Sequence, residues 1–289
     1  MSSPLPRRPY GKSGDRVSVV GFGGLALMAT EANHACRTVA VAVERGVNYF
    51  DVAPTYGNAQ ERLGPALEPF RKDCFLACKT IVRDAAGVRA ELNRSLEQLR
   101  TDHLDLYQMH ALDDPAKDLD AAFAPGGAIE AFVEARKDGR VRHIGFSSHN
   151  EATALAAMDR FDFDSVMFPI SFGPMLRTGF GQAVLDKAAS KGVTVVAIKA
   201  LARQPWPKDC PDRAKNGKCW YQPLKDRPQA DLALRFTLNQ GVASAISSGE
   251  EEMLWLALDI AQDLRPLTDD EMATLREFAE QVQPIFPKG

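Results

Sequence analysis

The feature that most constrains this chain is a repeated alternation of short apolar runs with segments of helical spacing. Each run is rich in apolar and β-branched residues, is bounded by turn residues and precedes a stretch of helical periodicity. The eight runs cover residues 17–24, 47–53, 74–80, 104–110, 141–148, 165–171, 193–201 and 242–248. Most are almost continuously apolar, which is typical of parallel strands covered on both faces.

Eight strand–helix units without a dividing linker predict an α/β fold, a single (β/α)8 TIM barrel spanning 1–289 as one domain. A helix is expected over 250–264, and Thr268 followed by Glu271 predicts an additional C-terminal helix over 269–282. An open doubly wound sheet is the main alternative. It is disfavoured because the first-strand turn reads GFGGLA and lacks the GxGxxG fingerprint.

The composition argues against nucleic acid or membrane as partners. The formal net charge is −3, and no apolar run approaches the length of a membrane span. Residues 1–10 lack the apolar core of a signal peptide, so a cytoplasmic location is expected. The five cysteines include no CxxC pair, which predicts free thiols; a redox role for Cys210 and Cys219 stays open.

Four polar residues follow the second, third and fourth predicted strands, on the face where barrel enzymes hold their active sites. They are Asp51, Tyr56, Lys79 and His110. A lysine in a barrel mouth needs a compensating carboxylate, and Asp51 ends the neighbouring strand. Lys79 near Tyr56 would lower the tyrosine pKa toward working pH and suit it to act as a general acid.

These four residues suit the addition of hydride to a carbonyl group, with His110 orienting the carbonyl oxygen. Each has a structural explanation when taken alone, as a helix cap, a loop aromatic, a solvated strand end or a core histidine. Four such coincidences at successive strand ends are less probable than one site. No GxSxG motif and no metal-ligand spacing competes, so no metal is expected.

The segments around these residues closely resemble the aldo-keto reductases over nearly the whole chain. The matching segments read VSVVGFGG, NYFDVAPTYGNAQERLG, CKT, LRTDHLDLYQMH and GRVRHIGFSSHN. The resemblance implies that Tyr56 donates a proton, Lys79 lowers its pKa, Asp51 fixes Lys79 and His110 orients the substrate. It also implies NADPH or NADH as cofactor and a small-molecule carbonyl or alcohol as substrate.

By the same resemblance, the cofactor-binding positions lie along the barrel mouth. They are Gly23, Gly24, Leu25, Asp51, Ser147, Ser148, Met167, Lys199, Leu201, Ser248, Gly249 and Glu252. Three depart from the usual family pattern: Ser148 replaces the Asn of a Ser-Asn pair that holds the carboxamide, Met167 stands where a Gln often grips it, and Lys199 where an aromatic often stacks on the nicotinamide.

The residues after the last strand read SSGEEEM and lack the basic residue that usually holds the 2′-phosphate of NADPH. Acidic residues in the first turn of a helix are also ordinary dipole matching. The run Glu250–Glu252 nevertheless favours the hypothesis that NADH binds at least as well as NADPH.

Two long connections, 113–127 and 202–228, would overhang the catalytic face. The second contains Trp206, Trp220 and Tyr221, which form either a substrate-contacting wall or a separate aromatic cluster. The alternatives to a reductase are a cofactor-binding sensor or regulatory subunit with little turnover, and a barrel hydrolase, lyase or isomerase. Substrate identity and oligomeric state do not follow from the sequence.

Overall fold

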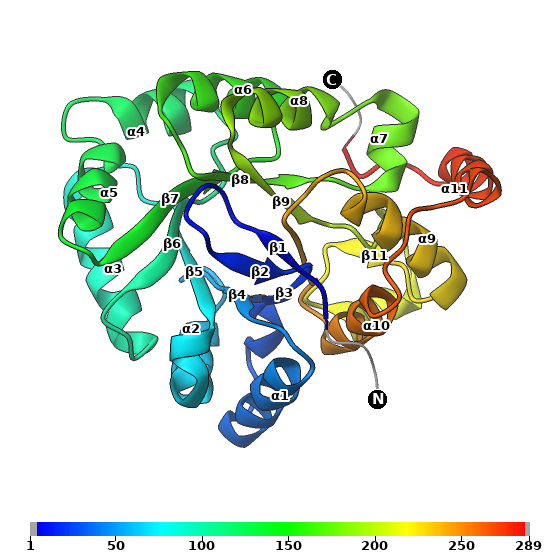
Figure 1. Ribbon diagram of the computed structural model, residues 1–289, viewed down its shortest axis with the longest axis horizontal. Coiled ribbons are helices and arrows are strands. Elements are labelled where there is room, and N and C mark those ends of the chain that lie inside the picture. Colours follow the sequence, from blue (N-terminus) through cyan, green and yellow to red (C-terminus); the bar gives the residue numbers. More distant parts are fainter. Residues whose placement is uncertain (1–4, 287–289) are drawn as a thin grey trace.

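The computed structural model describes residues 5–286, and its centre is a closed barrel of parallel strands (Figure 1). The barrel strands are β3 (Val20–Gly23), β4 (Tyr49–Asp51), β5 (Phe75–Thr80), β6 (Leu104–Met109), β7 (Val141–Ser147), β8 (Ser165–Pro169), β9 (Thr194–Ile198) and β12 (Ser244–Ile246). Neighbours follow chain order, and β12 pairs with both β9 and β3 to close the barrel. The predicted (β/α)8 barrel is confirmed. Residues 1–4 and 287–289 of the predicted domain lie outside the described part.

Helices surround the barrel on its outer side (Figure 1). The longer ones are α1 (Ala32–Glu44), α2 (Ala59–Leu67), α3 (Ala85–Gln98), α5 (Ala128–Lys137), α6 (Glu151–Arg160), α8 (Gln182–Lys191), α9 (Arg227–Leu238), α10 (Glu251–Ala261) and α11 (Asp269–Gln281). Shorter helical segments are η1 (Gly24–Leu27), η2 (Glu68–Asp73), η3 (Pro115–Asp120), α4 (Ala121–Phe123), α7 (Phe172–Thr178) and η4 (Pro211–Asn216). Within residues 5–286, no helix is long and apolar enough to span a membrane.

The amino end of the barrel is covered by a hairpin of β1 (Arg7–Pro9) and β2 (Arg16–Ser18), which lies in front of the strands in Figure 1. Tyr10, in the hairpin turn, is fully buried and packs against Tyr49 and Phe75 inside the barrel. The predicted first strand over 17–24 was therefore wrong at its start. Its first residues belong to the hairpin, because β2 pairs with β1 rather than with a barrel strand.

Several predicted strands extend beyond the observed ones at the catalytic end. The run 193–201 contains β9, which stops at Ile198, and the run 242–248 contains β12, which stops at Ile246. Their last residues form loops instead. After β9 the run stays apolar at Ala200 and Leu201, because both are buried over the barrel mouth, whereas the residues after β12 are Ser247 and Ser248.

The predicted additional C-terminal helix is confirmed as α11. Thr268 accepts from the backbone N–H of Glu271, and Glu271 accepts from that of Thr268, so both halves of the capping box are present. The buried guanidinium of Arg235 in α9 also donates to Glu271, at 2.7 Å. This contact holds α11 against α9.

The two long connections contain structure of their own. Residues 113–127 include η3 and α4, whereas 202–228 includes an antiparallel hairpin of β10 (Ala202–Pro205) and β11 (Tyr221–Pro223). The hairpin brings the second half of this loop back over the barrel mouth, where it helps to enclose the cavity described next.

Candidate active site

A cavity of about 240 Å³ opens among the loops at the carboxyl ends of the barrel strands. Its walls contain all four residues of the predicted tetrad and residues from the loop that carries β11. The lining comprises Gly23, Leu25, Asp51, Tyr56, Lys79, His110, Ser147, His149, Met167, Ile198, Lys199, Lys218, Trp220, Tyr221, Ile246, Ser247, Ser248 and Gly249.

The tetrad is held together by hydrogen bonds centred on Lys79. Asp51 ends β4 and Lys79 lies in β5, the adjacent strand, so their side chains meet inside the barrel. The Lys79 ammonium donates to a carboxyl oxygen of Asp51 and, at 3.4 Å, to the Tyr56 hydroxyl. The ring of His110 lies perpendicular to that of Tyr56, with centroids 6.0 Å apart. The structure thus brings together the four residues singled out from the sequence.

Burial and the ion pair set the protonation of this cluster. Burial lowers the pKa of Lys79, but the charges of and hydrogen bonds to Asp51 and Tyr56 together outweigh this and raise it, so the ammonium stays charged. Burial also raises the pKa of Tyr56 above its ordinary value, while Lys79 pulls it down. The expected net lowering of the Tyr56 pKa was wrong, because burial outweighs the lysine. Tyr56 therefore keeps its proton at neutral pH.

His110 follows β6 and is neutral at neutral pH. Burial, and then the positive charge of Lys79, lower its pKa to about 3. Its Nδ1 atom is buried without a hydrogen-bond partner among the described residues. A neutral imidazole with an unused ring nitrogen can form a hydrogen bond to a polar group in the cavity.

Most of the predicted cofactor residues also line the cavity. Besides Asp51 they are Gly23, Leu25, Ser147, Met167, Lys199, Ser248 and Gly249. The buried hydroxyl of Ser248 has no partner within residues 5–286, and it lies close before α10, whose first N–H groups lack partners within the helix. This end of the cavity can therefore bind an anion through a hydroxyl and backbone N–H groups.

Four predicted cofactor positions lie outside the cavity lining. Gly24 packs against Asp51, where an added Cβ would lie 2.7 Å from the backbone oxygen. Ser148 is fully buried and donates to the Leu112 carbonyl at 2.7 Å. Leu201 lines a small neighbouring cavity, and Glu252 is exposed on α10. The Ser148 side chain points away from the cavity because its hydroxyl donates to the backbone carbonyl of Leu112 in a neighbouring loop.

The three successive glutamates each have a different partner. Glu250 accepts from the backbone N–H of Lys218 at 2.9 Å, Glu251 contacts His34 at 2.6 Å, and Glu252 pairs with Lys225. Glu250 and Glu252 therefore both contact the long loop 202–228, through Lys218 and Lys225, whereas Glu251 does not. Glu252 neutralises a nearby lysine that could otherwise attract a phosphate.

The aromatic residues of the second long loop divide between two roles. Trp220 and Tyr221 line the cavity, and the Trp220 side chain is 54% exposed at its rim. Trp206 does not line it; its indole N–H donates to the Cys219 carbonyl at 2.8 Å and stabilises the loop itself. The loop is thus both a cavity wall and a small aromatic cluster.

Three polar residues of the site are absent from the sequence prediction. Gln108 donates to the second carboxyl oxygen of Asp51 at 3.0 Å. It lies two residues before His110, and this spacing on one strand could have placed both on the inward face. Asp113 and His149 follow β6 and β7 and form a chain to Lys199. Nothing in their sequence context indicates that contact.

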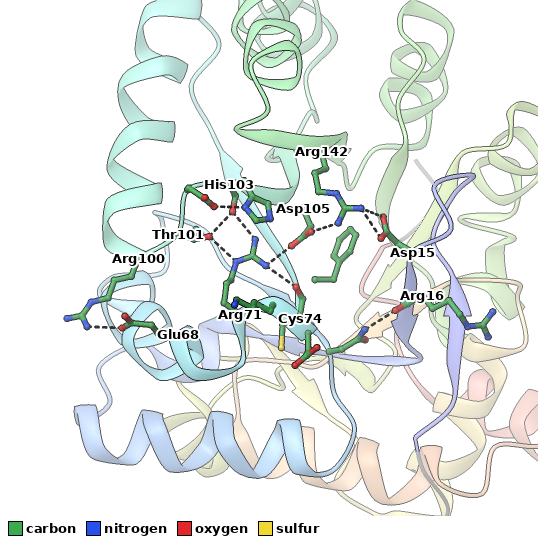
Figure 2. Close-up of a pocket in the computed structure, with 15 residues that line it drawn as sticks. Asp15, Arg16, Glu68, Arg71, Cys74, Arg100, Thr101, His103, Asp105 and Arg142 are labelled. Atoms are coloured by element: carbon green, nitrogen blue, oxygen red, sulfur yellow. Dashed lines mark hydrogen bonds and ion pairs between the residues drawn. The ribbon is translucent and has the colours of Figure 1, made fainter.

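A larger cavity, of about 870 Å³, lies at the opposite end of the barrel, among residues near the amino ends of the strands (Figure 2). Its charged side chains bind one another: Arg71 contacts Asp105 at 2.9 Å, and Arg142 contacts both Asp105 and Asp15. Arg71 also donates to the backbone of Cys74 and His103. This network stabilises the base of the barrel and lacks the buried lysine and tyrosine of the other end.

The cysteines and metal-binding side chains add no second centre. Cys36, Cys74, Cys78, Cys210 and Cys219 are all free thiols. Cys219 is buried, and burial raises its pKa, which works against a reactive thiolate. Within residues 5–286, no three His, Cys, Asp or Glu side chains form a metal-binding group.

Comparisons with known proteins agree with this geometry. Residues 19–216 match the model of the aldo/keto reductase family. An uncharacterized oxidoreductase, YqkF, of Bacillus subtilis is 25% identical, with 96% of this chain and 97% of the relative covered. L-galactose dehydrogenase of Arabidopsis thaliana is also 25% identical, with 98% and 97% covered. The holo form of an aldo-keto reductase from Bacillus halodurans has the same fold, with a TM-score of 0.72, 24% identity and 98% and 97% coverage.

Proposed function

This chain belongs to the aldo/keto reductase family and is an NAD(P)H-dependent oxidoreductase, and we propose that it reduces an aldehyde or ketone with Tyr56 as the general acid. The observation that carries the proposal is the contact of the Lys79 ammonium with both Asp51 and the Tyr56 hydroxyl. In the reverse direction, oxidised cofactor would accept the hydride of an alcohol and ionised Tyr56 its proton.

The residues present fit a nicotinamide cofactor. Leu25, Met167 and Ile198 provide apolar walls, and Ser248 and Gly249 border the amino end of α10. These last residues would hold the pyrophosphate, since helix N–H groups bind phosphates. When bound, NAD(P)H supplies the hydride that reaches the carbonyl carbon.

The chain's own residues supply the proton and orient the carbonyl. The Tyr56 hydroxyl is protonated at neutral pH and passes its proton to the carbonyl oxygen as the hydride reaches the carbon. Lys79 then stabilises the tyrosinate, because its ammonium stays charged beside Asp51. Neutral His110 donates a hydrogen bond to the carbonyl oxygen and so fixes its direction.

Replacing Tyr56 by Phe tests the proposal without altering the fold. We expect kcat for aldehyde reduction to fall by about 10²- to 10⁴-fold, the usual contribution of a general acid, with cofactor affinity changed less than about twofold. Tyr107→Phe is the matched control, because its buried hydroxyl has no partner in the described part of the chain and its ring packs on Phe132 outside the site.

The same experiment separates an enzyme from a cofactor-binding sensor on this fold. Turnover that depends on Tyr56 supports the reductase. Equal turnover in the wild type and Tyr56→Phe would exclude the assigned acid. Cofactor binding without turnover of any aldehyde or ketone in a broad panel would favour the sensor. The family match itself favours redox chemistry over the barrel hydrolase, lyase or isomerase alternative.

A further inference from the structure

We propose that Lys199 and His149 form a subsite for a carboxylate on the substrate, so that this reductase acts on aldehydes or ketones that carry an acidic group. The inference rests on the proposed function and names the substrate class for the same cavity. Its basis is a chain of three side chains, Asp113, His149 and Lys199, in the cavity wall.

The first link fixes the histidine. Asp113 accepts from the backbone N–H of His149 at 2.6 Å and contacts the His149 Nδ1 atom at 3.1 Å. A carboxylate at Nδ1 orients the ring, so that Nε2 points away from Asp113. The ring also stacks on Phe286, with centroids 5.6 Å apart. The Asp113 contacts and the stacking on Phe286 thereby hold the His149 ring in one orientation.

The second link aims the lysine. The Lys199 Nζ atom lies 3.0 Å from His149 Nε2, within hydrogen-bond distance. It also lies 5.7 Å from the ring centroids of both Trp220 and Phe286. Within residues 5–286, His149 is the polar contact given for this ammonium, and the remaining N–H groups of Lys199 are available to a ligand.

The position of the ammonium places this subsite in the substrate half of the cavity. Lys199 follows β9, which adjoins β12 and the phosphate-binding end before α10. Its side chain reaches instead to His149, which follows β7, two strands away from β9. It thus extends away from the pyrophosphate position and toward the side of the barrel that carries His110, after β6.

The charge of the cavity also favours an anion there. Its lining contains three lysines, Lys79, Lys199 and Lys218. The one carboxylate in the lining is Asp51, which is paired with Lys79. Lys218 donates to the Ala26 carbonyl at 2.7 Å, beside the phosphate-binding end. Lys199 therefore remains as the cation available to a substrate, and a charge-assisted contact to a carboxylate is the interaction it can best supply.

Binding of an anion by Lys199 should depend on pH. Burial lowers the pKa of Lys199 to about 7; Asp113 raises it and Lys79 lowers it. The other titratable groups facing this wall are His149, which contacts the amine, and neutral His110. Below this pKa the ammonium attracts an anion, and above it the neutral amine does not. A bound carboxylate would raise the pKa by the same linkage.

The test compares acids with their own methyl esters as substrates. We expect wild-type kcat/KM at pH 6.5 to favour 3- or 4-carboxybenzaldehyde over the matching ester by about tenfold or more, mainly through KM, since hydrogen bonds to charged groups are worth this much. Lys199→Met should bring the acid-to-ester ratio close to one. In the wild type, the ratio should fall between pH 6.5 and 8.5.

A second variant separates substrate from cofactor. Lys218→Met should weaken cofactor binding and leave the acid-to-ester ratio unchanged. If Lys199→Met instead weakens cofactor binding and preserves the ratio, the ammonium serves the cofactor and the proposal is wrong. The proposal would also be wrong if the wild type gave an acid-to-ester ratio near one for both the 3- and the 4-carboxybenzaldehyde pair.

A binding measurement keeps this inference distinct from the proposed reaction. Titration calorimetry of the cofactor-loaded protein with benzoate and with benzamide should show benzoate binding that is lost in Lys199→Met. Such binding without any turnover would uphold the anion subsite and reject the reductase. Turnover of aldehydes without Lys199-dependent benzoate binding would uphold the reductase and reject the subsite.

Discussion

Lys79 and Asp51 form an ion pair between adjacent barrel strands, and each side chain is at most 3% exposed. Removing one partner from a buried pair leaves an uncompensated charge, whereas removing both leaves none. Lys79→Met and Asp51→Asn should therefore each lower the free energy of unfolding by about 3–5 kcal/mol, and the double variant should lose less than the sum. Urea denaturation at pH 7 measures the free energy of unfolding of the wild type, the two single variants and the double variant. Additive losses would show that the pair is not coupled.

Gln108 should act as a positioning residue for Asp51. Gln108→Leu removes the hydrogen bond to the second carboxyl oxygen and should lower the free energy of unfolding by about 1.5–3 kcal/mol, the usual range for bonds to charged groups. Because Asp51 then orients Lys79 less well, we expect kcat to fall with KM for the carbonyl nearly unchanged. Gln108→Glu should not rescue activity, because it places a second carboxylate beside Asp51.

An exposed glutamine provides the matched control for this prediction. Gln182 also donates to a carboxylate, that of Asp186 at 2.9 Å, but on the surface of α8. Gln182→Leu should change stability by less than about 0.5 kcal/mol and leave kcat intact. If both variants lose the same stability and activity, burial beside Asp51 is not the cause.

The barrel and the tetrad could be predicted from the sequence because both follow from short-range patterns. A strand such as β5 is apolar up to Lys79 and Thr80, and a lone charge near the end of a buried strand indicates a partner on the next strand. Chain order then places Asp51 beside it. Strands that are consecutive in the chain are neighbours in the barrel, so the contacts between their ends can be predicted from strand order alone.

The remaining parts of the site depend on loops, whose course the sequence does not determine. Ser148 matches a cofactor position in the alignment of motifs, yet its hydroxyl bonds the Leu112 carbonyl in a neighbouring loop. His149, the next residue, meets Lys199 across two strands. Both contacts arise from the way three βα loops pack over the barrel mouth. The burial of Tyr56, which reverses the expected direction of its pKa, has the same origin.

The pair of Glu252 and Lys225 beside the phosphate-binding end should govern cofactor preference. In the wild type, Glu252 neutralises Lys225, so we expect NADH to bind at least as tightly as NADPH. Glu252→Ala frees the lysine for a 2′-phosphate and should shift the ratio of the two dissociation constants toward NADPH by about fivefold, the worth of one exposed charge contact. Fluorescence titration with both cofactors gives the ratio directly.

Glu251→Ala is the matched control for Glu252→Ala, because it removes the same charge from the same helical turn but releases His34 rather than Lys225. A shift confined to Glu252→Ala assigns the effect to Lys225, since a general change in field would act in both variants. Equal shifts would assign it to the net charge of the first turn of α10. A strong NADPH preference in the wild type would contradict the prediction, because a paired Lys225 offers the phosphate little attraction.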